Sequence, residues 1–214
     1  TEVANFAARY LNAIRCNNNE IDELADKRAR AFDSDIPKSK CDKCPHLKTC
    51  HETFGFVGLK NEVKVGLFPF SNTAPQKLLK SLTEIRHRTS PRGLLDLIMN
   101  KVLTQSYDQF AQHIFPNDRS FAVKRVALTY WTEVENKYLR GGAWLSGTDK
   151  NRAKFLAEFW FNAETAHECV SFLKPYLSPL SLPGISEELT GPVSKAELGT
   201  TTKTEKKAEL GTAT

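Results

Sequence analysis

A short stretch rich in cysteine and histidine constrains this chain more than any other feature. Residues 40–55 read KCDKCPHLKTCHETFG, with three cysteines and two histidines. Cys41 and Cys44 have the Cys-x2-Cys spacing that lets two thiolates bind one ion from a tight turn. Pro45 follows, fixes one φ angle and stiffens that turn. Free cysteines are usually scattered and buried, so this spacing predicts a metal site. We call residues 40–55 the knuckle.

The expected metal is zinc, held by Cys41, Cys44, Cys50 and His51. Three thiolates and one imidazole make the closed Cys3His shell of structural zinc sites. Cys50 and His51 are adjacent, so both can bind the ion only if the backbone kinks between them. His46 is the weaker candidate, because its side chain is expected to point outward.

An iron–sulfur cluster is the alternative cofactor. Cys16 lies upstream of the knuckle and would complete a set of four thiolates with Cys41, Cys44 and Cys50. Some nucleases hold a 4Fe-4S cluster with one distant cysteine and such a knuckle. Zinc is favoured, because His51 is already in place and needs no long-range closure.

Composition is typical of a globular protein in a reducing compartment. The chain has 214 residues, 40% of them hydrophobic, enough for a core in one domain or two small ones. No apolar run approaches the roughly 18 residues of a membrane span, and no signal peptide is visible. Five cysteines, three at metal spacing, do not indicate a disulfide framework. We therefore expect a cytoplasmic protein without a membrane partner. The start at Thr1 and the single methionine hint at a piece of a longer protein.

Hydrophobic periodicity predicts helices before the knuckle and a hairpin after it. Residues 2–15 carry an apolar helical stripe that leaves Arg9 and Arg15 outside, and a narrower stripe runs from Ile21 to Phe32. Two β segments follow the knuckle, within residues 54–59 and 63–68, and can pair as a short hairpin.

Helices dominate the rest of the predicted structure. The apolar patterns place them at residues 74–86, 91–103, 121–131, 151–162 and 163–177. Ser90 is the expected N-cap of the second, with Pro91 at its first position. Arg140, Gly141 and Gly142 predict a flexible break.

These patterns divide the chain into three parts. Residues 1–72 hold the first helices, the knuckle and the hairpin, and residues 73–183 form a helical domain. Residues 184–214 lack apolar periodicity and are expected to be disordered; they repeat a KAELGT hexamer that is too short for a solenoid. The predicted fold class is mainly α, a helical bundle or winged-helix-like lid, with a small β hairpin and a metal-binding knuckle.

No common catalytic motif occurs in the chain. It lacks a Gly-x4-Gly-Lys-Ser/Thr phosphate loop, a Gly-x-Ser-x-Gly elbow and a His-Glu-x-x-His helix. His167 and Cys169 lie on a predicted helix and face different directions, so they do not predict a catalytic couple. Cys169 is expected to be a small core residue.

Basic residues concentrate around one predicted helix–turn–helix. They are Lys77, Lys80, Arg86, His87, Arg88 and Arg92. Such clustering is the electrostatic footprint either of a solvated face or of a phosphate-binding surface. The second possibility suggests an alternative function, a non-enzymatic zinc module that binds nucleic acid. An iron–sulfur DNA-processing accessory protein is a third.

The order of four segments resembles a known family. The segments are ARYLNAIR at residues 8–15, the knuckle, GLFPFS at residues 66–71 and SPRGLL at residues 90–95. Together they are similar to the C-terminal side of large P-loop ATPases encoded in bacterial anti-phage defence islands. The resemblance covers roughly residues 5–105, and the knuckle is its most specific part.

The resemblance implies a regulatory lid of an AAA+-like or STAND-like ATPase. In such ATPases an Asn/Ser-Pro-Arg at a lid helix offers an arginine to the nucleotide phosphates, and Arg92 matches that position. The phosphate loop and the acidic metal-binding strand of the ATPase core are missing from this chain. ATP would therefore bind only through a core supplied elsewhere, and the implied partners are that core or other defence-system subunits.

Overall fold

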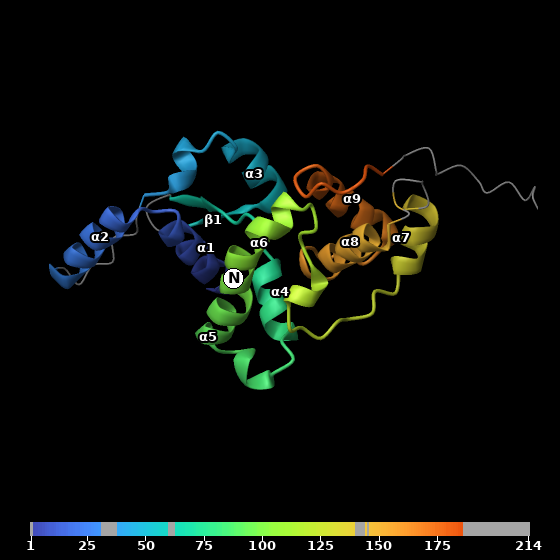
Figure 1. Ribbon diagram of the computed structural model, residues 1–214, viewed down its shortest axis with the longest axis horizontal. Coiled ribbons are helices and arrows are strands. Elements are labelled where there is room, and N and C mark those ends of the chain that lie inside the picture. Colours follow the sequence, from blue (N-terminus) through green and yellow to red (C-terminus); the bar gives the residue numbers. More distant parts are fainter. Residues whose placement is uncertain (1, 31–37, 60–62, 140–143, 145, 186–214) are drawn as a thin grey trace, which may run out of the picture.

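The described part of the chain is mainly helical with one small antiparallel hairpin, as the sequence predicts. The computed structural model describes residues 2–30, 38–59, 63–139, 144 and 146–185 (Figure 1). The helices are α1 (Glu2–Ile14), α2 (Asn18–Arg30), α3 (Leu47–Phe54), α4 (Ala74–Ser81), α5 (Pro91–Leu94), α6 (Asn100–Ala111), α7 (Trp131–Tyr138), α8 (Gly147–Phe159) and α9 (Ala166–Leu177). Shorter turns are η1 (Lys40–Lys43), η3 (Ile85–His87), the π-helical η4 (Leu95–Met99) and η5 (Asp118–Ser120). The predicted break at 140–142 and nearly all of the predicted disordered tail lie outside the described residues.

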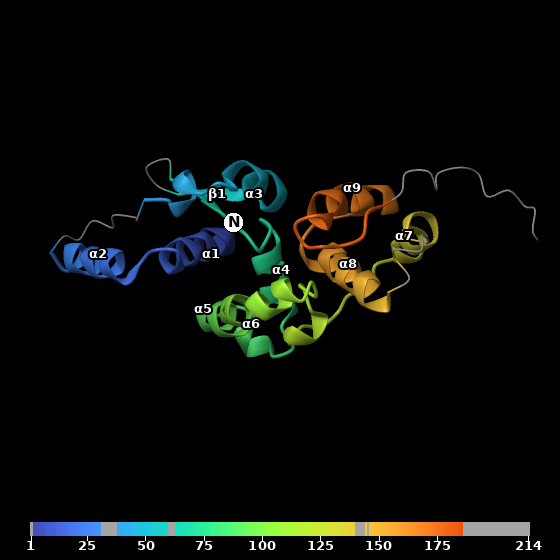
Figure 2. The ribbon, with the colours of Figure 1, turned by 45° about the horizontal axis from the view of Figure 1, so that its top comes forward.

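The two ends of the molecule are built from different helices. In both views α2 lies at one end, beyond α1, and α7 lies at the other end with α8 and α9 (Figures 1 and 2). The hairpin lies beside α1, and α3 packs on β2 (Figure 1). None of the described helices combines the length and the apolar character needed to cross a bilayer.

The hairpin follows α3 directly and forms one edge of the knuckle. Strand β1 (Phe56–Gly58) pairs with β2 (Lys64–Gly66), with Val57 opposite Val65. Gly55 joins α3 to β1 at a φ of +80°, a conformation that favours glycine. A Cβ there would also lie 2.7 Å from Asn72 Nδ2.

One apolar cluster extends from α1 to α9. It includes the fully buried Leu11, Leu78, Leu156 and Leu173, which come from α1, α4, α8 and α9. Burial of such side chains stabilises each by about 1.5–3 kcal/mol relative to exposure. The cluster therefore joins the elements around the knuckle to the C-terminal helices.

Trp160, at the end of α8, is hydrogen-bonded to the segment that leads from the hairpin to α4. Its indole Nε1 donates to the Pro69 carbonyl at 2.9 Å. Its own carbonyl accepts from Thr73 Oγ1 at 2.7 Å and from Ser71 Oγ. A carbonyl at a helix end lacks an intrahelical partner, so these hydroxyl groups complete the end of α8.

The predicted N-cap of the helix that begins at Pro91 is confirmed. Ser90 Oγ accepts a hydrogen bond from the Gly93 N–H at 3.0 Å, and Pro91 is the first residue of α5. The helical run continues through η4 and α6 to Ala111, beyond the predicted end at residue 103.

The predicted helix at residues 121–131 is wrong. Val123 forms an isolated antiparallel bridge with Leu82, and the Lys124 N–H donates to the Ser81 carbonyl at 2.6 Å. The N–H of Val126 donates to the buried carboxylate of Glu158. These distant acceptors replace helical hydrogen bonds, and α7 begins only at Trp131.

Gly93 allows η3 to pack closely on the first turn of α5. A Cβ at Gly93 would lie 2.1 Å from the His87 carbonyl oxygen, which is backbone and cannot move freely. Gly93→Ala is therefore expected to lower the free energy of unfolding by about 1–3 kcal/mol. Urea denaturation followed by circular dichroism measures the change.

Gly147→Ala is the matched control, since a Cβ at this position, at the start of α8, would have no atom within 4 Å. It should leave the unfolding midpoint nearly unchanged. Equal stability of the two variants would contradict the close packing of η3 on α5.

Candidate functional site

The first half of the knuckle is fixed on strand β2 by Ser39. The Ser39 hydroxyl donates to the Lys64 carbonyl at 2.6 Å and accepts from the Cys41 N–H at 3.1 Å. The Cys44 N–H then donates to the Cys41 carbonyl at 2.8 Å and closes the turn. Cys41 is buried as a result, whereas Cys44 is exposed.

Two cysteine sulfurs accept hydrogen bonds from the end of the hairpin. The Gly66 N–H donates to Cys41 Sγ at 3.2 Å. Burial raises the pKa of the Cys50 thiol, and a hydrogen bond with the Phe68 backbone and the charge of Arg15 oppose that rise. Hydrogen bonds to sulfur favour the thiolate, which is the form that binds metal ions.

The ring of His51 is buried on one side and lacks a partner there. Nε2 is one of two buried side-chain polar atoms, among the described residues, that make no hydrogen bond. The ring stacks on Phe56 with centroids 5.0 Å apart. Burial, with Lys64 and Arg15 nearby, lowers the pKa of His51, which keeps the ring neutral at pH 7. An unpaired buried nitrogen costs about 1–3 kcal/mol, a cost that a bound ion would remove.

Gly66 brings Cys50 and His51 to one place. A Cβ on Gly66 would lie 3.1 Å from His51 Nε2 and 3.3 Å from Cys50 Sγ, so both atoms approach a single point. They do so although α3 runs without interruption from Leu47 to Phe54. The requirement of a backbone kink between the two residues is therefore wrong, because both side chains reach Gly66 from an unbroken helix.

The knuckle is not arranged as a finished metal shell. In the described ranges, no three Cys, His, Asp or Glu side chains are grouped closely enough to hold an ion as they stand. Cys41, Cys44, Cys50 and the exposed His46 border a cavity of about 640 Å³. Neither His51 nor Cys16 is among the residues that line it. The Cys16 thiol donates to the Asn12 carbonyl at 3.4 Å.

Lys77 does not share a surface with the other members of the predicted basic cluster. Its Nζ donates to the Glu158 and Phe161 carbonyls at 3.1 and 2.6 Å. Burial lowers the pKa of Lys77. The side chain therefore satisfies carbonyls at the end of α8 and is not available to phosphate.

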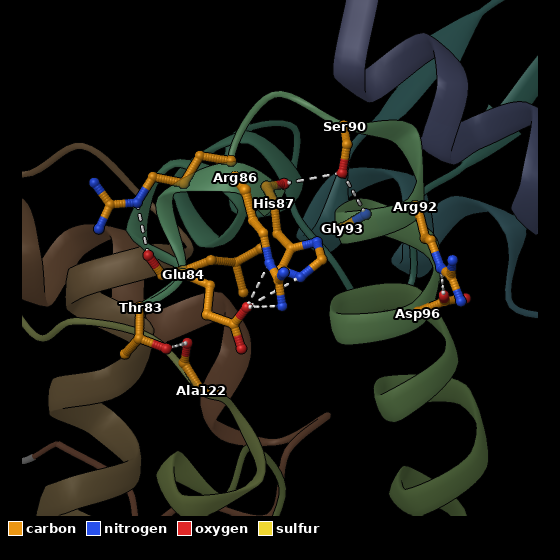
Figure 3. A network of polar contacts seen from close by, with 11 residues as sticks. Thr83, Glu84, Arg86, His87, Ser90, Arg92, Gly93, Asp96 and Ala122 are labelled. Carbon is orange, nitrogen blue, oxygen red and sulfur yellow. Dashed lines mark hydrogen bonds and ion pairs between the residues drawn. The ribbon is translucent and has the colours of Figure 1, made fainter.

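Three other members of the cluster surround a small cavity (Figure 3). Arg86, His87 and Arg92 line about 420 Å³ together with Asp96 and Leu97. The Arg92 side chain is 84% exposed, and its Nε lies 3.0 Å from Asp96 Oδ2. The Arg92 side chain thus projects from the start of α5 and forms an ion pair with Asp96, one turn further along the helical run.

Carboxylates balance part of the charge around this cavity. Glu84 Oε2 lies 2.8 Å from a terminal nitrogen of Arg86 and 3.2 Å from His87 Nε2. Arg88 is used locally, since its Nε donates to the Leu82 carbonyl at 2.6 Å. Exposed ion pairs of this kind are worth about 0–1 kcal/mol, so a phosphate group can displace them at little cost.

Sequence reasoning missed Arg15, which it placed on the solvated side of the first helix. The guanidinium instead donates to the carbonyls of Gly66 and Phe68 at 2.9 and 3.1 Å. Helical periodicity carries no signal for such a contact, because its partners lie more than fifty residues away in the sequence.

Comparison with known proteins provides no relative from which a function can be transferred. No family model, no curated protein and no solved structure matches the chain. The geometry of the knuckle and of the cavity beside Arg92 is therefore the basis on which a function can be proposed.

The cysteines should differ in their reaction with iodoacetamide. Cys44 is exposed and should be modified first in the native metal-free protein. Cys169 should be modified last, because burial raises its pKa to about 12 and shields the sulfur. Peptide mass spectrometry over a time course at neutral pH measures both rates.

The urea-denatured chain is the control for this labelling, since both sulfurs should then react at similar rates. Equal modification of Cys44 and Cys169 in the native protein would contradict the burial of Cys169.

Proposed function

We propose that this chain is a regulatory module built on a structural zinc site, and that it serves as the lid and C-terminal helical region of a bacterial anti-phage defence ATPase. The zinc ligands are Cys41, Cys44, Cys50 and His51. One observation carries the metal assignment: His51 Nε2, buried and unpaired, approaches the same point beside Gly66 as Cys50 Sγ. The proposal also assigns the protein to the cytoplasm, where thiols stay reduced.

The chemistry of the knuckle fits zinc in ligand number and type. Three thiolates and a neutral imidazole form the closed tetrahedral shell of a structural site. Cys41 Sγ already accepts a hydrogen bond from a backbone N–H of the hairpin. Outer-shell groups of metal sites make such hydrogen bonds to the ligands. Cys44 is exposed on the adjoining turn, and since no three ligands are grouped as they stand in the described part of the chain, several of these side chains would have to move to close the shell.

Zinc would act as a cross-link within the small N-terminal elements. Its ligands come from η1, from the turn that follows it and from α3, segments with few hydrophobic side chains to hold them together. In such sites the free energy of metal binding is also free energy of folding. The ion would fix the orientation of the knuckle against α1 and the hairpin.

Metal analysis tests this assignment. The purified protein is expected to be colourless and to contain about one zinc per chain. Cys44→Ser should release the metal and melt the knuckle, because the shell loses a ligand. His51→Ala should also lose zinc, whereas His46→Ala, which removes an exposed imidazole of the same knuckle, should keep it. Inductively coupled plasma mass spectrometry measures the content.

The cluster alternative gives a different result in the same preparation. A brown protein with broad absorbance near ~400 nm, and loss of that colour in a Cys16→Ser variant, would establish an iron–sulfur cluster. A protein that binds neither metal would overturn the assignment altogether.

The lid part of the proposal is supported by the surroundings of Arg92. The Ser90 cap and Pro91 begin a helical run there, and Arg92 projects beside a cavity that Arg86 and His87 also line (Figure 3). Arginine binds phosphate oxygens bidentately, which lysine does not reproduce. In the proposed lid these residues face the nucleotide phosphates of a core supplied by the rest of the ATPase.

Arg92→Ala tests this role in the full ATPase. The change is expected to weaken the nucleotide response or ATP hydrolysis and to leave the thermal midpoint unchanged, because the side chain is largely exposed. Arg119→Ala, another exposed arginine that does not line the cavity, is the matched control and should keep the full response.

The nucleic-acid alternative predicts another outcome for the same variant. If the cavity binds DNA, Arg92→Ala should lower DNA affinity and reduce the slope of log affinity against log salt by about one phosphate contact. A variant that matches the parent in both assays would remove the residue-level support for the lid.

A further inference from the structure

Arg15 ties the end of α1 to the far edge of the knuckle. Its NH1 donates to the Gly66 carbonyl at 2.9 Å and lies 3.6 Å from Cys41 Sγ. Its NH2 donates to the Phe68 carbonyl at 3.1 Å. One guanidinium therefore contacts a sulfur of the knuckle and two carbonyls of the segment beside it.

Gly66 and Phe68 are shared between Arg15 and the sulfurs. The carbonyl of each residue accepts a hydrogen bond from Arg15. The backbone of Gly66 is also hydrogen-bonded to the sulfur of Cys41, and the backbone of Phe68 to the sulfur of Cys50. The end of the strand is thus hydrogen-bonded both to the guanidinium and to the two cysteines. A shift of Arg15 would move both hydrogen-bond donors away from their sulfurs.

We infer that Arg15 is a positioning residue of the metal site, an inference that rests on the proposed zinc function. Zinc with three thiolates and one imidazole carries one negative charge in excess, and the guanidinium lies where it balances that charge. Its carbonyl contacts also hold the Gly66 N–H on Cys41 Sγ. Outer-shell groups of this kind typically change metal affinity by about 10–100-fold.

The two contributions of Arg15 are separable by substitution. Lysine keeps the positive charge but has no planar fork to span two carbonyls and a sulfur. Glutamine keeps polar atoms and loses the charge. Arg9 lies on the same helix and is exposed, so Arg9→Gln removes an equal charge from α1 without touching the knuckle.

Zinc affinity of the variants, measured by competition with a chromophoric chelator, tests the inference. Arg15→Gln is expected to weaken zinc binding by about 10–100-fold, Arg15→Lys by less, and Arg9→Gln not measurably. Cobalt substitution supplies a second readout, since the sulfur-to-cobalt charge-transfer band should shift in Arg15→Gln and stay in place in Arg9→Gln. Circular dichroism identifies any variant that fails to fold. If Arg15→Gln fails to fold, the position of the cobalt charge-transfer band is measured in Arg15→Lys instead, and a shift relative to the unaltered protein supports the inference.

The results distinguish this inference from the proposed function. Failure of the unaltered protein to bind zinc or cobalt overturns the metal assignment and the role of Arg15 with it. Tight zinc binding with the same affinity and the same cobalt band in Arg15→Gln overturns only the role of Arg15.

Discussion

The structure depends on the hydrogen bonds of the backbone between Gly66 and Ser71, which is buried except at Phe68. A buried carbonyl or N–H without a partner costs about as much as a lost hydrogen bond, and here distant side chains supply the partners. Arg15 donates to the carbonyls of Gly66 and Phe68, and Trp160 donates to the Pro69 carbonyl. The sulfur of Cys41 accepts from the Gly66 N–H. This segment therefore joins α1, the knuckle and the end of α8, which are far apart in the sequence.

That arrangement gives the knuckle a rigid support on one side only. Cys41 and Cys50 lie against the end of the hairpin, whereas Cys44 lies on the exposed turn. A bound ion would draw the exposed turn that carries Cys44 toward Cys41 and Cys50, so metal binding and local folding would be coupled. The helical run that begins at Pro91 packs on α4, and α4 comes shortly after residues 66–71 in the chain. The proposed lid function therefore depends on the support that this segment receives.

Local patterns predicted what depends on neighbours in the sequence. The helix of residues 2–15, the hairpin and the Ser90 cap all follow from periodicity and cap chemistry, and the structure has them. The helix predicted at residues 121–131 failed, because Ser81 and Glu158 offer hydrogen-bond partners that the local sequence does not reveal. The knuckle residues were visible as a motif, but Arg15 was not, since its partners are distant in the sequence. The role of Lys77 at the end of α8 was hidden for the same reason.

X-ray absorption at the zinc edge tests the proposed Cys3His zinc site, because it counts the atoms bound to the ion. We expect three sulfurs at about 2.3 Å and one nitrogen at about 2.0–2.1 Å, with the nitrogen lost in His51→Ala and retained in His46→Ala. A shell of oxygen and nitrogen atoms without sulfur, a shell of four sulfurs, or a protein that binds no zinc would contradict the proposed site.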